Sequence, residues 1–255
     1  MSYSHSITSL FLLLLLPALM TNCSEDQIVE MENLERDLML TWIALEREDE
    51  PQIAAFNDAT QKDWQLMSQQ YRQLRMSPAV RQSAGRINLW MVNLKNAVRH
   101  NQPKRAMMAV SLMQNELRTL RPQMGINHPA DRLYDFYYQW QDVVAASNDP
   151  MMCLLDWNEY EERYELAAKS WTEYVAARPR FSDTLFPGYG RNAIDAEEAA
   201  VAMTGSLRQF GLILEQADHT LAAEPSRMID DLFFDYLAVV TDYPVELTAA
   251  SLSPL

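Results

Sequence analysis

The chain has 255 residues, of which 48% are hydrophobic and 10% aromatic, and it carries a formal net charge of −14. This composition excludes an intrinsically disordered protein, and a strongly acidic chain is unsuited to binding nucleic acid. Glycine is scarce, at 6 residues, which favours helices over sheets.

The N-terminus carries a hydrophobic segment that is too short to span a bilayer. Residues 10–20 read LFLLLLLPALM and are followed by Thr21, Asn22 and Cys23. This is the length of a signal-peptide core, whereas a transmembrane helix needs about 20 apolar residues. The segment resembles the signal peptide and lipobox of a bacterial lipoprotein. That resemblance implies that residues 1–22 are removed and that Cys23 is acylated and becomes the first residue of the mature protein.

The segment departs from the usual lipobox pattern at several positions, so two other interpretations of the N-terminus stay open. Met20 and Asn22 stand where a lipobox usually has leucine and a small residue, and no Lys or Arg precedes the hydrophobic segment. An ordinary cleaved secretory peptide and an uncleaved anchor are the alternatives. Lipoprotein processing would place the protein in the cell envelope, facing the periplasm and held to a membrane by its N-terminal lipid. Ser24, rather than an aspartate, follows the cysteine, which resembles the outer-membrane sorting pattern of enterobacterial-type lipoproteins and implies the outer membrane.

Apolar residues recur at helical spacing through almost all of the remaining chain. We expect the third helix to begin with Ser77 as its N-cap and Pro78 as its first residue. The fold prediction is all-α, an antiparallel bundle of seven to eight helices in one bundle or two fused ones. Its N-terminal half is residues 23–125, its C-terminal half residues 126–245, and a flexible tail residues 246–255. The expected helices lie near residues 27–47, 53–74, 78–98, 106–120, 133–148, 157–178, 192–222 and 229–240.

Charge is distributed unevenly along the chain. Residues 24–71 hold 12 acidic and 3 basic side chains, residues 72–132 hold 2 and 11, and residues 133–255 hold 21 and 7. One interpretation is that the basic middle packs against its acidic flanks and the charges offset one another. The other is a basic face for an anionic partner, such as lipid headgroups or an envelope polyanion.

Aromatic and arginine residues in the second half predict a binding surface. Tyr134 and Tyr138 lie on the side of their helix opposite Phe136 and Trp140, so this helix is either packed on both faces or presents a patch. The longest expected loop, residues 179–191, is either functional or a crossover that covers one end of the bundle. The candidate surface residues are Tyr134, Tyr138, Arg180, Phe181, Phe186, Tyr189 and Arg191.

The chain shows no motif for catalysis or a cofactor. Met151, Met152 and Cys153 are weak candidates for Cu(I) ligands, although methionine also fills helical cores. No group of titratable residues converges on one predicted face, so an enzyme is not expected. The sequence therefore predicts a lipid-anchored, non-catalytic envelope protein with a binding or adaptor role, whose partner is another envelope protein bound through the aromatic and arginine-bearing surface. A metal-, haem- or small-ligand-binding bundle in the periplasm is the alternative.

Overall fold

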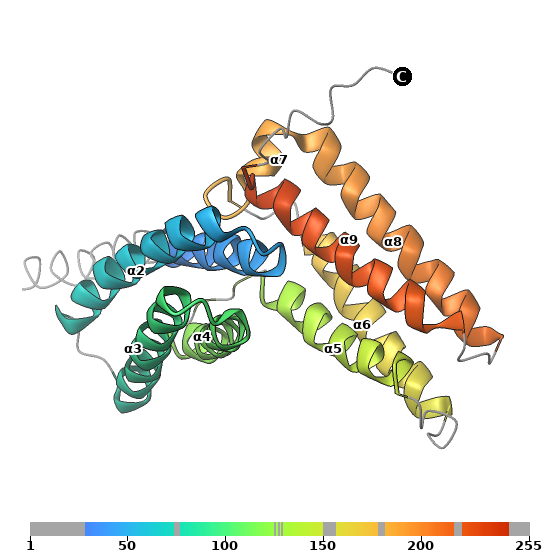
Figure 1. Ribbon diagram of the computed structural model, residues 1–255, viewed down its shortest axis with the longest axis horizontal. Coiled ribbons are helices and arrows are strands. Elements are labelled where there is room, and N and C mark those ends of the chain that lie inside the picture. The colour runs from blue at the N-terminus through green and yellow to red at the C-terminus, as the bar shows by residue number, and fades with distance from the viewer. Residues whose placement is uncertain are drawn as a thin grey trace, which may run out of the picture. The chain divides into compact units, whose positions relative to one another are not determined.

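A computed structural model describes residues 29–73, 77–124, 126, 128, 130–149, 157–177, 182–216 and 221–244. All regular secondary structure in these ranges is helical, which confirms the all-α prediction. Within the same ranges, no helix has the length and apolar character that crossing a bilayer requires. The helices are residues 29–46, α2 (Glu50–Gln73), α3 (Pro78–Arg99), α4 (Pro103–Gln123), α5 (Asp131–Ser147), α6 (Trp157–Ala177), α7 (Pro187–Arg191), α8 (Ala193–Glu215) and α9 (Ala223–Thr241) (Figure 1).

Several helix ends follow the expected local rules. The Ser77 side chain accepts a hydrogen bond from the backbone N–H of Val80 and caps α3, as predicted. The predicted helix over residues 192–222 is too long, because α8 ends at Glu215 and Gln216 lies in a turn. The next helix, α9, begins at Ala223 and includes Pro225 in its first turn, where the missing N–H costs no intrahelical bond.

The described helices belong to two compact units. Unit 1 comprises Met1–Thr41 and Glu50–Ile126, and unit 2 comprises Trp42–Asp49 and Asn127–Leu255. The helix over residues 29–46 therefore contributes its first part to unit 1 and its last turn to unit 2. The two halves expected from sequence differ from these units because they assign residues 42–49 to the N-terminal half.

In unit 1, residues 29–41 and helices α2, α3 and α4 surround one apolar core. Polar contacts join these four segments in a closed ring, each segment being linked to the next and α4 to the first. Because each contact needs its two residues at matching heights, the ring fixes how the helices are aligned along one another. The contacts are Thr41 with Thr60 (3.1 Å), Trp64 Nε1 to Asn88 Oδ1 (2.6 Å), Arg86 Nε to Glu116 Oε1 (2.5 Å), and Arg121 with Glu35.

Two carboxyl groups of unit 1 also face each other between residues 29–41 and α2. Burial, followed by the negative charge of Asp63, raises the pKa of Asp37 to about 6. Burial likewise raises the pKa of Asp63. The two side chains are hydrogen-bonded, so below about pH 6 they share a proton rather than carrying two like charges.

In unit 2, α5, α6, α8 and α9 form a four-helix arrangement in which α5 packs on α6 and α9, and α8 packs on α6 and α9 (Figure 1). The core is strongly aromatic. Trp42 belongs to this core, with its ring 4.5 Å from that of Tyr137 and 5.1 Å from that of Phe234. This packing explains why residues 42–49 belong to unit 2.

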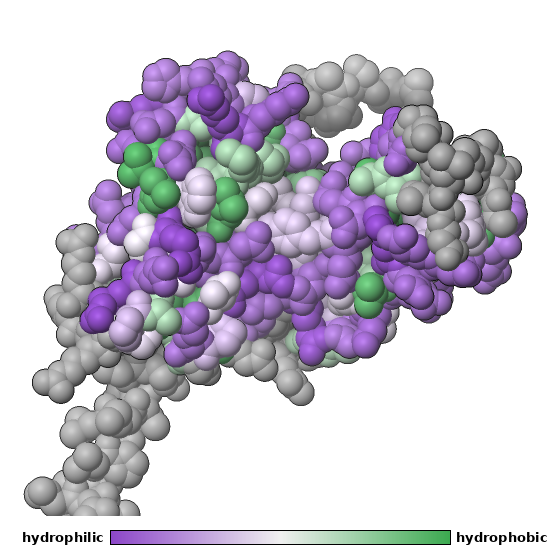
Figure 2. Space-filling view, turned by 90° about the horizontal axis from the view of Figure 1, so that it is seen from below, coloured by the Kyte–Doolittle hydropathy of each residue, from purple (hydrophilic) through white to green (hydrophobic). Residues whose placement is uncertain are grey.

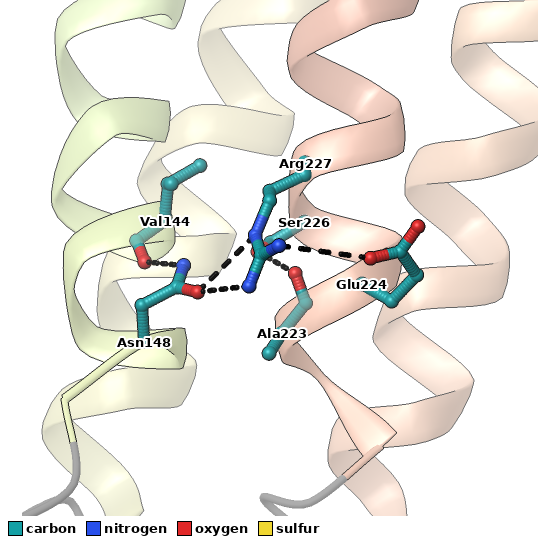
Figure 3. A network of polar contacts seen from close by, with 6 residues as sticks. All are labelled: Val144, Asn148, Ala223, Glu224, Ser226 and Arg227. Carbon is teal, nitrogen blue, oxygen red and sulfur yellow. Dashed lines mark hydrogen bonds and ion pairs between the residues drawn. The ribbon is translucent and has the colours of Figure 1, made fainter.

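One polar network joins the end of α5 to the start of α9 (Figure 3). Asn148, the C-cap of α5, donates from Nδ2 to the Val144 carbonyl oxygen at 2.7 Å. Its Oδ1 accepts from Arg227 of α9 at 2.8 Å, and Arg227 also lies 3.8 Å from Glu224. One amide therefore satisfies a free helix carbonyl and links two helices. The predicted end of the fifth helix near residue 148 is confirmed.

Candidate functional site

The α3–α4 hairpin in unit 1 is built from two helices joined by a very short loop. Proline stands at the start of both helices, where its fixed φ suits the first turn. Residues 100–102 connect them, and Asn101 has a φ of 49°, a left-handed conformation that asparagine tolerates better than most residues. The connection holds α3 and α4 side by side as neighbours.

One face of α3 is directed away from the core of unit 1. The core-facing side chains of α3 include Val80, Ile87, Met91 and Leu94, all buried. At 100° per residue, the opposite face covers an arc of about 120°. Two cations and two apolar side chains occupy that arc, namely Arg81, Arg99, Leu89 and Val92, and the half-buried Lys95 lies at its edge.

Basic side chains of the hairpin greatly outnumber acidic ones. Residues 77–124 contain eight Lys and Arg residues, and Glu116 is the one carboxylate. Glu116 is bound to Arg86, and Arg121 is bound to Glu35 in the core. Five cations make no ion pair with any residue of the described ranges: Arg81, Lys95, Arg99, Lys104 and Arg105.

Within the described residues of unit 1, this finding favours the interpretation of a basic face for these five residues. All except the half-buried Lys95 are exposed, and Arg105 donates a hydrogen bond to the neutral Gln102 side-chain oxygen at 3.0 Å. The hairpin therefore presents a concentrated positive charge on a protein whose net charge is −14.

Apolar side chains are exposed among these cations. Leu89 and Val92 of α3 are 54% and 56% exposed, and Met108 of α4 is 56% exposed. Figure 2 shows hydrophobic side chains grouped within the hydrophilic surface on the left, where Figure 1 places α2, α3 and α4. Single exposed apolar residues are ordinary, but apolar residues set among unpaired cations form an amphipathic surface.

A groove runs between α3 and α4 near their connecting loop. Its volume is about 610 Å³, and none of its lining residues is acidic. His100 places its Nδ1 2.7 Å from the Asn96 carbonyl oxygen, which fixes the orientation of the imidazole. The groove therefore offers cationic, amide and indole groups to an anionic ligand. It is lined by Trp90, Asn93, Asn96, Ala97, His100, Gln102, Arg105, Met108 and Ala109.

A second groove of similar volume, between α6 and α8 in unit 2, has the opposite charge. Glu161, Glu165 and Glu215 line it together with Arg208 and several uncharged residues. Like-charged carboxylates suit a cationic rather than an anionic ligand. Among the described residues, however, no three His, Cys, Asp or Glu side chains gather closely enough to hold a metal ion.

One carboxyl group of unit 2, that of Asp230, has a raised pKa. Burial, followed by the negative charge of Glu46, raises the pKa of Asp230 to about 6, and Gln141 donates a hydrogen bond to it at 2.6 Å. Raised carboxyl pKa values are typical of acid–base sites. Asp230 lines neither of the two grooves, and neither does Asp37 of unit 1. In both cases burial is the main cause of the raised pKa.

Two of the residues predicted to form a binding surface lie in the core instead. Tyr134 and Phe186 are both 0% exposed, so their assignment to a surface is wrong. Tyr134 is covered because Trp42 packs against it, with the two ring centroids 6.1 Å apart. Trp42 thus lies against the side of α5 that was predicted to be exposed. Tyr138 is half-buried, with its ring 5.7 Å from that of Tyr137.

The other described members of that predicted surface, Tyr189 and Arg191, serve to hold α7 in place. The hydroxyl group of Tyr189 is hydrogen-bonded to that of Tyr236 in α9, which is also 2.6 Å from the hydroxyl of Tyr174 in α6. Burial raises the pKa of Tyr174 well above its usual value. Arg191 is bound to Asp242. Within the segment predicted as a loop over residues 179–191, residues 187–191 form the short helix α7, which packs against α8 and α9.

The remaining candidates lie outside the described residues. These are the lipidation candidate Cys23, the surface candidates Arg180 and Phe181, and the metal-ligand candidates Met151, Met152 and Cys153. The functional residues that the sequence interpretation did not single out are the cations of the α3–α4 hairpin. The sequence signal for these cations was the excess of positive charge over residues 72–132. That excess did not indicate which individual residues form the site.

The hairpin is consequently the candidate functional site. This assignment rests on its exposed cations and apolar side chains and on no similarity to another protein. The chain matches no protein-family model, and neither a curated protein nor a solved structure matches it significantly.

Proposed function

We propose that the chain is a lipid-anchored, non-catalytic binding protein of the bacterial envelope, whose α3–α4 hairpin binds an anionic partner. The anchor is the acylated Cys23, the protein faces the periplasm, and Ser24 favours the outer membrane. Support for the anchor comes from the hydrophobic segment over residues 10–20 that ends at Cys23.

The observation that carries the binding role is the set of five hairpin cations without an acidic partner in the described ranges. Like charges repel one another, and four of these five cations are exposed. Their proximity to exposed Leu89 and Val92 gives the face the mixed charged and apolar character of an interaction surface.

The anchor is tested by intact-mass analysis of the membrane-fraction protein expressed in a bacterium. We expect a mature chain that begins at Cys23 and carries added acyl mass, because the thiol of this residue is the attachment point. The Cys23→Ala variant should lose that mass. A wild-type chain that retains Met1 and carries no added mass would contradict lipid anchoring.

The binding role is tested on a column of the sulfated polysaccharide heparin at low salt, with the chain from Ser24 onward, which contains every described helix. A protein of net charge −14 should pass through unless a local basic face retains it. We expect retention of the wild type, and its loss in the Lys95→Glu/Arg99→Glu variant.

The matched control is Lys169→Glu/Arg208→Glu, which changes the net charge equally but at exposed positions of unit 2. This control should be retained like the wild type. Passage of the wild type through the column, or equal loss of retention in both variants, would refute a binding role for the hairpin.

A further inference from the structure

We propose that the anionic partner of the α3–α4 hairpin is the phospholipid headgroup layer of a membrane, onto which the outer face of α3 docks. This inference rests on the proposed function and specifies its ligand. It follows from the charge of the hairpin, from its exposed apolar side chains, and from the position of the expected lipid attachment in the chain.

Charge gives the attraction and the orientation. Arg81, Lys95 and Arg99 lie on one side of α3, and Lys104 and Arg105 begin α4. Each cation near an anionic bilayer contributes about 1 kcal/mol of attraction. The chain as a whole is acidic, so an anionic surface repels most of the protein and attracts it at this hairpin.

Apolar contact makes a bilayer a better fit than a soluble polyanion. Leu89 and Val92 project from the same arc of α3 as Arg81 and Arg99, so a helix lying flat could bury both apolar side chains while its cations reach headgroup phosphates. The groove between α3 and α4 adds Met108, which is 56% exposed. A hydrophilic polyanion would leave these side chains in water.

The expected attachment point lies close to the same unit. Six residue steps separate Cys23 from Val29, where the first described helix begins, and six steps reach roughly 20 Å at most. Residues 29–41 belong to unit 1, as does the hairpin. A lipid on Cys23 would hold unit 1 within reach of the headgroups, so even a weak docking face would be occupied at the resulting high effective concentration.

The test measures co-sedimentation of the chain from Ser24 onward with lipid vesicles, so that no acyl chain or leader contributes. One set of vesicles is phosphatidylcholine alone and the other contains about 30% phosphatidylglycerol, an anionic lipid. We expect binding to the anionic vesicles only, reduced at least about tenfold in about 0.5 M NaCl, where exposed charges are screened.

Three variants locate the binding face. Lys95→Glu/Arg99→Glu should weaken binding by about tenfold or more, because two attractions become repulsions. Lys169→Glu/Arg208→Glu should bind like the wild type. Leu89→Ser/Val92→Ser keeps every charge and should lower affinity several-fold through lost apolar burial. All substituted side chains lie outside the cores, and circular dichroism checks that each variant is folded.

The outcomes separate this inference from the proposed function. Absence of vesicle binding by a protein that heparin retains would overturn the lipid assignment and leave a non-lipid anionic partner. Equal binding to both kinds of vesicle, or equal loss in both charge variants, would overturn it as well. If the protein bound neither heparin nor vesicles, both the lipid assignment and the proposed binding role would be refuted.

Discussion

Glu35→Ala is expected to lower the free energy of unfolding by about 3–5 kcal/mol, because it removes the carboxylate bound to a fully buried guanidinium. Glu35 and Arg121 are both 0% exposed, and their ion pair closes the ring of polar contacts in unit 1. Urea unfolding followed by circular dichroism, on the chain from Ser24 onward, measures the loss.

Two comparisons isolate the effect of burial. The Glu35→Leu/Arg121→Met variant removes both charges and should be more stable than Glu35→Ala, because no charge then stays in the core. Glu159→Ala breaks an exposed pair with Arg163 on α6 and should cost less than about 0.5 kcal/mol. Similar losses for Glu35→Ala and Glu159→Ala would show that the buried pair contributes no more than an exposed one.

Gly188→Ala should destabilise unit 2 by about 1–3 kcal/mol, because α7 lies too close to α9 for a side chain. A Cβ atom at this position would lie 2.0 Å from the Val239 carbonyl oxygen and 2.9 Å from the Val240 Cα. Both are backbone atoms, so no rotamer change relieves the overlap. Thermal and urea unfolding measure the effect.

Gly85 and Gly205 provide matched controls for this substitution. Both lie within long helices, and a Cβ at either would meet no atom within 4 Å. Alanine at these positions should stabilise the chain by about 0.5–1 kcal/mol, since it restricts the unfolded chain and favours the helix. If Gly188→Ala were as stable as these controls, α7 could not be packed against α9 as described.

Local chemistry accounts for the parts of the fold that the sequence predicts well. Ser77 and Pro78 mark the start of α3, and Asn101 to Pro103 mark the turn into α4, because caps and prolines act within a few residues of themselves. Apolar spacing likewise identifies the core stripes. The end of α8 escapes this reasoning because Leu214, Ala217 and Leu221 continue the helical pattern beyond Glu215.

Non-local contacts account for what the sequence does not reveal. The two glycines of α7 are typical of a loop, and this helix depends on packing against Val239 and Val240, about 50 residues away. Tyr134 looks available for binding until Trp42 is known to cover it. For the hairpin, composition predicts an excess of positive charge, but only the fold distinguishes the cations held by Glu35 and Glu116 from those that have no such carboxylate.

The hairpin separates the residues that fold it from the residues that it displays. Val80, Ile87, Met91 and Leu94 bury one side of α3, whereas Arg81, Leu89, Val92 and Arg99 on the opposite side are exposed. Mutations on that side can therefore accumulate with little effect on stability, which is usually within about 0.5 kcal/mol at such positions. Natural variation could retune the affinity of this face, or reverse its charge, while the same helical scaffold is inherited unchanged.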